Sequence, residues 1–246
     1  MTAPAAGART GAPASVRVYR IPHSTNVVRV ALAAALKGVT VEWIDVEPAD
    51  RSELVRVSGQ PLVPVLVVGD GPVGAPGVEL LTDSPRILYW LEQRFPEPPL
   101  LPADPHQRAA VEVFCDWFNR VWKGPPNAIE AEEAKAAAGG LVDAAAIAGW
   151  SAELRASLDL FEGLLGGGGA GAGFLFGDRI TLADVTAWPF LLYAVLGVPA
   201  DDAERFHHIL VEQLPLGDGY PLLRAWVERV AALREGQIAL ASRFCG

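Results

Sequence analysis

Two short segments of this chain hold backbone and polar groups that suit the binding of a small acidic molecule. The first is Pro61-Leu62-Val63-Pro64, which leads into the apolar run 65–68. A proline cannot donate to a strand ladder, so Pro64 belongs at the start or edge of a strand, and the peptide bond before it can be cis at modest cost. We expect this kink to turn the amide and carbonyl of Val63 toward a ligand.

The second segment, Thr82-Asp83-Ser84-Pro85, is typical of the start of a helix. Asp and Ser are favoured cap residues, and Pro85 stands in the first turn, where proline fits. The unpaired amides and the partial positive charge of a helix start attract a carboxylate. A simpler alternative is that Asp83 only complements the helix dipole. If the two segments converge, they form a cleft for a peptide-like acidic molecule.

Composition and charge narrow the class of protein. Hydrophobic residues make up 51% of the 246 residues and charged residues 20%, which is typical of a globular chain with a large core. The net charge of -9 and the lack of clustered Lys and Arg argue against nucleic acid as a partner. Cys115 and Cys245 are too few and too far apart for a disulfide framework or a CxxC motif, so we expect a reduced, cytoplasmic setting.

The N-terminus and the longest apolar run argue against export and against a membrane partner. Residues 1–15 are rich in Ala, Pro and Gly and lack the apolar core of a secretory signal, so we expect a disordered tail. The apolar run 180–198 contains Asp184 and Pro189, which favours a buried helix over a membrane span.

The order of expected elements predicts two domains of different class, an α/β domain followed by an all-helical one. The first, residues 16–95, reads as βαβαββα, which implies a four-stranded mixed sheet. Its strands are expected at 16–19, 39–46, 63–68 and 78–81, and its helices at 27–37, 50–57 and 88–95.

A proline-rich stretch at 96–105 reads as the linker. No convincing strand follows, and residues 106–246 are expected to be all-helical, with helices at 107–123, 150–165, 182–196 and 222–233. The Gly- and Ala-rich stretch 163–173 follows a helix and lacks a Gly-Lys-Ser/Thr ending, so it reads as a connector and not as a phosphate-binding loop.

This plan, with a proline at the start of the third strand, resembles the cytosolic glutathione transferase family of the serine-type, bacterial-like kind. Four segments carry the resemblance: 19–26 leading into Lys37-Gly38, 63–66, Asp83-Ser84 and 180–184. The last is also a helix-capping box in its own right, with Thr181 as the cap and Asp184 three residues on. The resemblance implies a thioredoxin-like first domain, glutathione as co-substrate, no metal and a homodimer.

The resemblance also implies a set of glutathione-binding residues at the kinked peptide and the helix tip: Val63, Pro64, Asp83 and Ser84. Family members often carry a basic residue just before this proline to meet the glycyl carboxylate, and here Leu62 replaces it. Gln60 or Arg56 is the candidate substitute. If neither serves, the glycyl end is bound weakly or the thiol is not glutathione.

Ser24, at the entry of the first helix, is the first candidate for acting on the thiol. A hydroxyl that donates to sulfur favours the thiolate, and helix N-termini or cationic neighbours lower a cysteine thiol pKa from about 8.5 to roughly 3.5–7.5. Asn26, in the same turn, can assist or replace Ser24. Tyr19 and His23 are weaker candidates, and the simpler role for Ser24 is a helix cap.

The electrophile pocket is expected between the loop after the first strand and the first helix of the second domain. Its predicted lining is Ile21, Pro22, His23, Trp117, Phe118 and Trp122. Aromatic residues at this spacing also suit a core. Cys115, on the same helix, reads as a packing residue because nothing nearby offers the positive charge that a reactive thiolate needs.

Three functions follow from this resemblance. In the first, the glutathione thiolate attacks an apolar electrophile. In the second, addition and elimination of the thiol isomerise a double bond, because Ser24-Thr25-Asn26 resembles the Ser-rich loop of isomerase-active classes. The third is a binding protein that kept the fold and lost the chemistry. The two enzymatic functions require the main chain of Val63 to lie beside the Asp83 helix tip.

Overall fold

The computed structural model describes residues 15–167 and 173–244, and the predicted disordered tail lies outside them apart from Ser15. The first domain has the predicted element order: β1 (Val16–Arg20), α1 (Thr25–Leu36), β2 (Glu42–Asp45), α2 (Ser52–Ser58), β3 (Val65–Val68), β4 (Glu79–Thr82) and α3 (Ser84–Arg94). The element bounds differ from the predicted ones by a few residues, and α3 starts at Ser84, where the segment Asp83-Ser84-Pro85 predicts a helix start.

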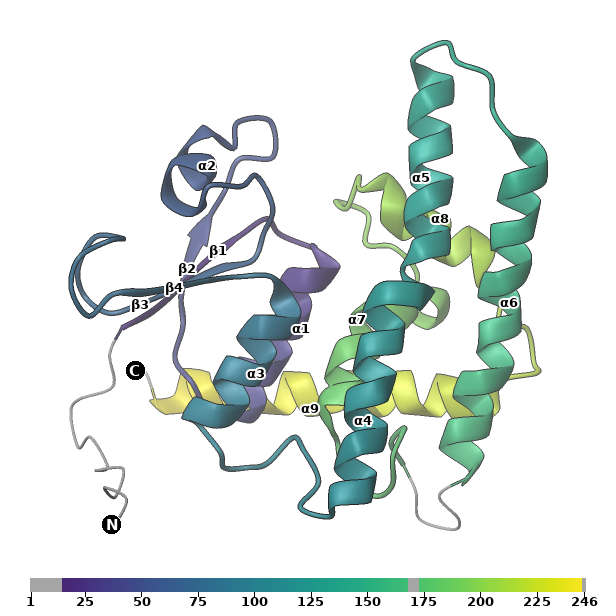
Figure 1. The fold of residues 1–246 in the computed structure, drawn as a ribbon. Coiled ribbons are helices and arrows are strands. Elements are labelled where there is room, and N and C mark those ends of the chain that lie inside the picture. The colour runs from purple at the N-terminus through teal and green to yellow at the C-terminus, as the bar shows by residue number, and fades with distance from the viewer. Residues whose placement is uncertain (1–14, 168–172, 245–246) are drawn as a thin grey trace, which may run out of the picture.

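The sheet is four-stranded and mixed, in the order β2-β1-β3-β4. β1 and β2 are parallel, and β3 is antiparallel to both of its neighbours. The unbroken apolar sequence of β3 follows from its position, since all four of its residues are buried. α1 and α3 pack together between the sheet and the second domain (Figure 1). The first domain is therefore thioredoxin-like.

The strand register brings the two predicted segments together. Tyr19 of β1 is paired with Val65 of β3, and Val65 is paired with Thr82 of β4. Val63-Pro64 and Asp83 therefore lie at the same end of the sheet. The Val63-Pro64 peptide bond is cis. The geometry meets the condition that the enzymatic functions require.

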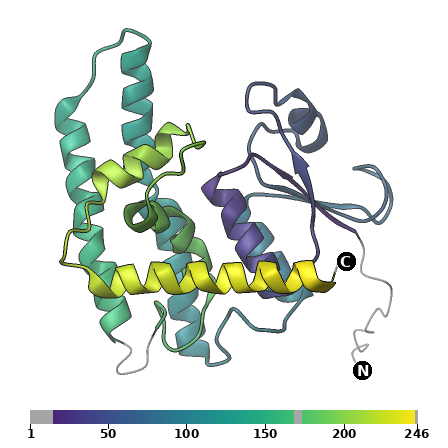
Figure 2. The same cartoon turned by 180° about the vertical axis from the view of Figure 1, so that it is seen from behind.

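The second domain is helical, as predicted. It contains α4 (Pro105–Trp117), the π-helix η1 (Phe118–Trp122), α5 (Gly124–Ala137), α6 (Ala144–Gly167), α7 (Leu182–Leu196), α8 (Arg205–Gln213) and α9 (Pro221–Phe244). Between Arg94 and Pro105 the chain has no helix or strand, which is compatible with the expected linker at 96–105. α9 runs along the back of the molecule and packs against α1, α6 and α7 (Figure 2).

Two helices of this domain escaped the sequence analysis. α5 begins at Gly124-Pro125-Pro126, which looks like a helix breaker. Proline suits the first turn, however, because the N–H that it lacks would be unpaired there anyway. α8 is short, and its apolar residues are spaced over only two turns. The predicted helix 107–123 is one continuous path, but it changes from α4 to the wider η1 at Phe118.

α7 forms the centre of the second domain and is buried on almost every side. Its start confirms the predicted capping box between Thr181 and Asp184. The Asp184 carboxylate also accepts hydrogen bonds from the Leu175 amide at 2.9 Å and from Trp226 Nε1 at 2.8 Å, so it ties α7 to α9. Among the helices of the described residues, none is both long and apolar enough to cross a membrane.

Candidate active site

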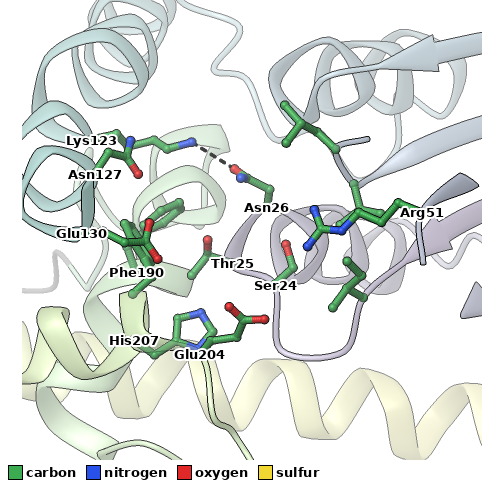
Figure 3. A pocket seen from close by; sticks show the side chains of 14 residues that line it. Ser24, Thr25, Asn26, Arg51, Lys123, Asn127, Glu130, Phe190, Glu204 and His207 are labelled. Carbon is green, nitrogen blue, oxygen red and sulfur yellow. Dashed lines mark hydrogen bonds between the residues drawn. The ribbon is translucent and has the colours of Figure 1, made fainter. Parts of the chain in front are cut away.

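A cavity of about 260 Å³ lies between the two domains. The first domain lines one side of it and the second domain the other (Figure 3). The polar and charged groups around it include Ser24, Asn26, Arg51, Lys123, Glu130 and His207. Ile21 and Val63 also line the cavity, as the sequence analysis expects of them. The cavity thus contains both candidate catalytic residues, Ser24 and Asn26.

Ser24 stands at the N-cap of α1, but its side chain makes no cap hydrogen bond. The simpler role of a helix cap is therefore not what its hydroxyl performs here. The side chain is half-buried and lines the cavity, with no hydrogen-bond partner among the described residues. A hydroxyl in this place can donate to a ligand atom, and the positive end of α1 favours an anion there.

Asn26 connects three elements through one atom. Its Oδ1 accepts hydrogen bonds from Ser84 Oγ in α3, Arg29 Nη1 in α1 and Lys123 Nζ between η1 and α5, each at 3.2 Å. Ser84 is 2% exposed, so its hydroxyl is turned inward. Asn26 therefore holds the helix tips of the first domain against the second domain, at the edge of the cavity.

Arg29 lies directly behind Asn26 and is fully buried. Its guanidinium also donates to the Thr186 carbonyl at 2.8 Å and to Asn119 Oδ1 at 2.8 Å, and it lies over the ring of Phe190 at 4.5 Å. Burial lowers the pKa of Arg29 to about 9. Arg29 was not among the residues predicted for the site, although a single Arg inside the apolar sequence of α1 is unusual.

Lys123 is the cation of the second domain in this cavity. Burial, followed by the charge of Arg29, lowers its pKa to about 8. Elsewhere along the wall are the carboxylates of Glu130 and Glu204 (Figure 3). The pKa of Glu130 is raised, mainly by burial and then by Glu204. The cavity is therefore lined by separate cationic and anionic groups and is not a purely apolar pocket.

His207 adds a histidine–carboxylate pair to the cavity wall. Its Nδ1 lies 2.7 Å from Oδ2 of the buried Asp202, and its ring stacks on Tyr193 with the centroids 4.3 Å apart. Burial lowers the pKa of His207, which favours the neutral ring. Residues 15–167 and 173–244 contain no group of three or more His, Cys, Asp or Glu arranged to hold a metal.

The predicted aromatic wall of the pocket is corrected by the structure. Phe118 and Trp122 are buried at 0% and 3% exposure and stack on each other in the core, with ring centroids 4.4 Å apart. Trp117 packs against the same core. Phe206, from α8, lines the cavity in their place, and Phe190, from α7, borders it but is itself 0% exposed. The predicted aromatic residues therefore belong to the core, and α8 supplies the partly exposed aromatic side chain of the wall.

The loop residues before Ser24 divide between cavity and surface. Ile21 lines the cavity, whereas Pro22 is exposed and is not among its lining residues. His23 adopts a φ of 67° and directs its ring toward Asp201 and Asp202, at 3.6 and 3.9 Å, so it does not line the cavity either. The structure thus keeps one of the three predicted loop residues in the pocket wall.

Two family models match this chain. Residues 18–99 match the model described as Glutathione S-transferase, N-terminal domain, and residues 144–229 match the one described as Glutathione S-transferase, C-terminal domain. A curated relative, the maleylpyruvate isomerase of Ralstonia sp, is 31% identical over 220 residues, which cover 85% of this chain and 89% of the relative. The chain belongs to the cytosolic glutathione transferase family.

Solved structures of family members agree with this assignment. One is the holo structure of a maleylpyruvate isomerase, described as a bacterial glutathione transferase of the zeta class, with 28% identity and a TM-score of 0.66 over 90% of this chain and 95% of that chain. Another is a maleylacetoacetate isomerase from Anaeromyxobacter dehalogenans with dicarboxyethyl glutathione and citrate in its active site. It is 28% identical, with a TM-score of 0.64 over 91% of this chain and 90% of that chain.

The glutathione-binding positions that the family resemblance implies lie at one end of the sheet, but they differ in exposure. Val63 lines the cavity, whereas Pro64 and Ser84 are buried. Asp83 caps no helix amide, is exposed, and adopts a φ of 73°, a conformation that non-glycine residues seldom hold outside functional or strained sites. The Asp83 carboxylate has no hydrogen bond or ion pair with any described residue, so it is available to a ligand ammonium.

Neither of the two candidate substitutes for the missing basic residue, Gln60 and Arg56, lines the cavity. Gln60 donates its side-chain amide to the Leu62 carbonyl at 2.9 Å and does not line the cavity. Arg56 is exposed and lies 3.6 Å from Glu53. Arg51 lines the cavity instead, held by the carbonyls of Pro48 and Pro61 at 3.2 and 3.1 Å. No local sequence pattern marks Arg51, because its position depends on the loops on both sides of α2.

Tyr19, the remaining weaker candidate, and Cys115, the predicted packing residue, lie away from the cavity. Tyr19 is buried in the sheet, in the smaller of the two clusters of the core. Cys115 is 5% exposed, and burial raises the pKa of its thiol to about 11, so it packs as the sequence analysis predicts. Neither side chain lines the cavity that holds Ser24.

Proposed function

We propose that this protein is a glutathione-dependent isomerase that converts a cis double bond to trans in a small substrate carrying carboxylates. The observation that carries the proposal is the similarity to the maleylpyruvate isomerase of Ralstonia sp, which extends through both domains. The cations on the cavity wall support an acidic substrate in place of the apolar electrophile that the sequence analysis favoured. Isomerisation, which the sequence alone left as an alternative, is therefore the main proposal.

Glutathione, when bound, would supply a thiolate that adds to one carbon of the double bond and leaves after rotation about the resulting single bond, so it is not consumed. This chain would orient it through groups at the sheet end. The Val63 main chain would pair with its peptide backbone, and Asp83 would bind its ammonium group. Arg51 would meet the glycyl carboxylate, and the Ser24 hydroxyl would donate to the sulfur and favour its ionised form.

Transfer of glutathione to an electrophile is the second candidate function. Phe206 and Leu62 line the cavity, and these two side chains offer an apolar surface to a substrate ring. Both reactions need the same ionised thiol. In isomerisation the adduct eliminates the thiol again, whereas in transfer the adduct leaves the protein as the product. A cytoplasmic location and assembly as a homodimer, which the family resemblance implies, are further parts of this proposal.

A continuous ultraviolet assay with maleylpyruvate or maleylacetoacetate tests the function. The purified chain should convert either compound to its trans isomer only when glutathione is present. A Ser24→Ala variant should lose at least tenfold in kcat/KM, and the pKa of the bound thiol, read from thiolate absorbance, should rise. Tyr19→Phe serves as the control, because Tyr19 lies away from the cavity. Conjugation without isomerisation would favour the transferase, and glutathione binding without either reaction would favour a binding protein.

A further inference from the structure

Two cations, the fully buried Arg29 and the half-buried Lys123, meet at one corner of the cavity. Both donate to Asn26 Oδ1, and the other hydrogen-bond partners of the Arg29 guanidinium are neutral oxygens. No carboxylate of the described residues lies within ion-pair distance of either cation. Nη2 of Arg29 is buried and has no hydrogen-bond partner among the described residues. Buried charges in proteins are usually paired, so this corner is short of an anion.

Lys123 is the member of the pair that a ligand can reach. It lines the cavity, whereas Arg29 is fully buried behind Asn26. An ammonium has three N–H donors, and Lys123 uses one on Asn26. The Nζ atom lies 5.3 Å from the centre of the Phe190 ring, which holds the amine at the wall. The unused donors of a positioned ammonium are suited to a carboxylate.

The acidic groups of the cavity do not supply the missing anion. Glu204 lies beside His207 (Figure 3), and among the described residues neither Glu130 nor Glu204 lies within ion-pair distance of Arg29 or Lys123. The lowered pKa values of Arg29 and Lys123 agree with a cationic corner, since the only acid that acts on both is the exposed Asp83.

We propose that Lys123 is the specificity residue that receives a carboxylate of the electrophile, beside Asn26, with Arg29 adding positive charge from behind. This rests on the proposed function for the direction of the reaction, but the binding subsite itself does not depend on turnover. A carboxylate here would bring one end of the substrate to the wall opposite Arg51. The double bond would then lie between Lys123 and Arg51, on the side of the cavity that holds Ser24.

Binding of an unreactive pair of probes tests the subsite. Succinate and its neutral analogue succinamide have the same carbon skeleton and differ in charge. Titration calorimetry of the full chain in the presence of saturating glutathione should show succinate binding at least tenfold tighter than succinamide. Lys123→Met should weaken succinate binding tenfold or more and leave succinamide unchanged, while Lys123→Arg should keep most of the affinity because it keeps the charge.

Arg120→Met is the matched control, because Arg120 is a highly exposed basic residue three positions away, with its side chain 78% exposed. It removes the same charge and should leave succinate binding at the wild-type value. The affinity of the wild type for succinate should also fall as the pH rises through about 8, where Lys123 loses its proton. The charged or titratable groups that face Lys123 or share its cavity are Arg29, Asp83, Arg51, Glu130, Glu204 and His207.

Three results would overturn the proposal: equal binding of succinate and succinamide, wild-type succinate binding by Lys123→Met, or an equal loss in Arg120→Met. Glutathione affinity, measured on every variant, separates a loss of the subsite from a loss of the fold. If the charge-dependent binding appears but no maleyl compound is isomerised, the subsite stands and the proposed function falls. If a maleyl compound is isomerised but succinate binding does not depend on Lys123, the proposed function stands and the subsite falls.

Discussion

Arg29 Nε in α1 donates a hydrogen bond to the carbonyl oxygen of Thr186 in α7, at 2.8 Å. The two residues belong to different domains, and the arginine is fully buried between them. The same guanidinium is the donor to Asn119 Oδ1 at 2.8 Å. One side chain thus fixes the distance between the helix that carries Ser24 and the helices that form the opposite wall of the cavity.

Arg29→Met should destabilise the fold by about 2 kcal/mol, because Asn119 Oδ1 and the Thr186 carbonyl lose a charged donor in the interior. Urea unfolding measured by Trp fluorescence gives the free energy of unfolding. Arg56→Met is the control, since Arg56 is exposed and pairs only with Glu53. A loss below about 0.5 kcal/mol, the usual size of a surface change, would mean that the domains do not depend on this contact.

Arg51→Gln should weaken glutathione binding about tenfold, which corresponds to about 1.4 kcal/mol, if Arg51 holds the glycyl carboxylate. The monoethyl ester of glutathione at the glycyl end lacks that carboxylate. It should bind the wild type about tenfold more weakly than glutathione does, and Arg51→Gln should bind both alike. Calorimetry on the four combinations forms a double-mutant cycle. Arg56→Gln serves as the charge-matched control, and two independent, additive losses would argue against the contact.

Lys123→Met should stabilise the protein by an amount of order 1 kcal/mol near neutral pH, because it removes a half-buried cation that has no ion-pair partner among the described residues. The amine has a pKa of about 8 in the folded protein and an ordinary value of 10.5. Below pH 8 the folded state carries the full cost of the charge. Between pH 8 and 10.5 the folded state releases the proton while the unfolded state keeps it, so wild-type stability rises with pH and the advantage of Lys123→Met shrinks. Thermal unfolding of both proteins across this range measures the difference, and a constant gap would contradict the assignment.

Asp184→Ala should cost about 3 kcal/mol, because it leaves the buried amides of Leu175 and Thr181 and the indole N–H of Trp226 without an acceptor. Denaturant unfolding provides the measurement. Asp178→Ala is the control, since Asp178 is exposed in the loop before α7. An effect on glutathione affinity without an effect on stability would show that Asp184 acts at the site and not in folding.

The aromatic residues of α4 and η1 illustrate what the sequence could not predict. A repeat of aromatic residues predicts a buried or half-buried helix face, and Phe114, Phe118 and Trp122 are indeed buried. Whether such a face meets a core or a cavity depends on what packs against it. Here Phe190 of α7 packs against Phe118, with ring centroids 5.4 Å apart, so this face meets the core.

The sequence by itself determined the order of strands and helices in the first domain, the cis-compatible proline before β3, the capping box of α7 and the candidate residues Ser24 and Asn26. These features depend on neighbours within a few residues, where turn chemistry and apolar periodicity act. Only the tertiary structure decided that Arg51, Lys123 and His207 surround one cavity, with Arg29 buried behind Asn26, since these residues lie on separate elements. Their meeting is fixed by long-range packing between the domains, and no local pattern encodes it.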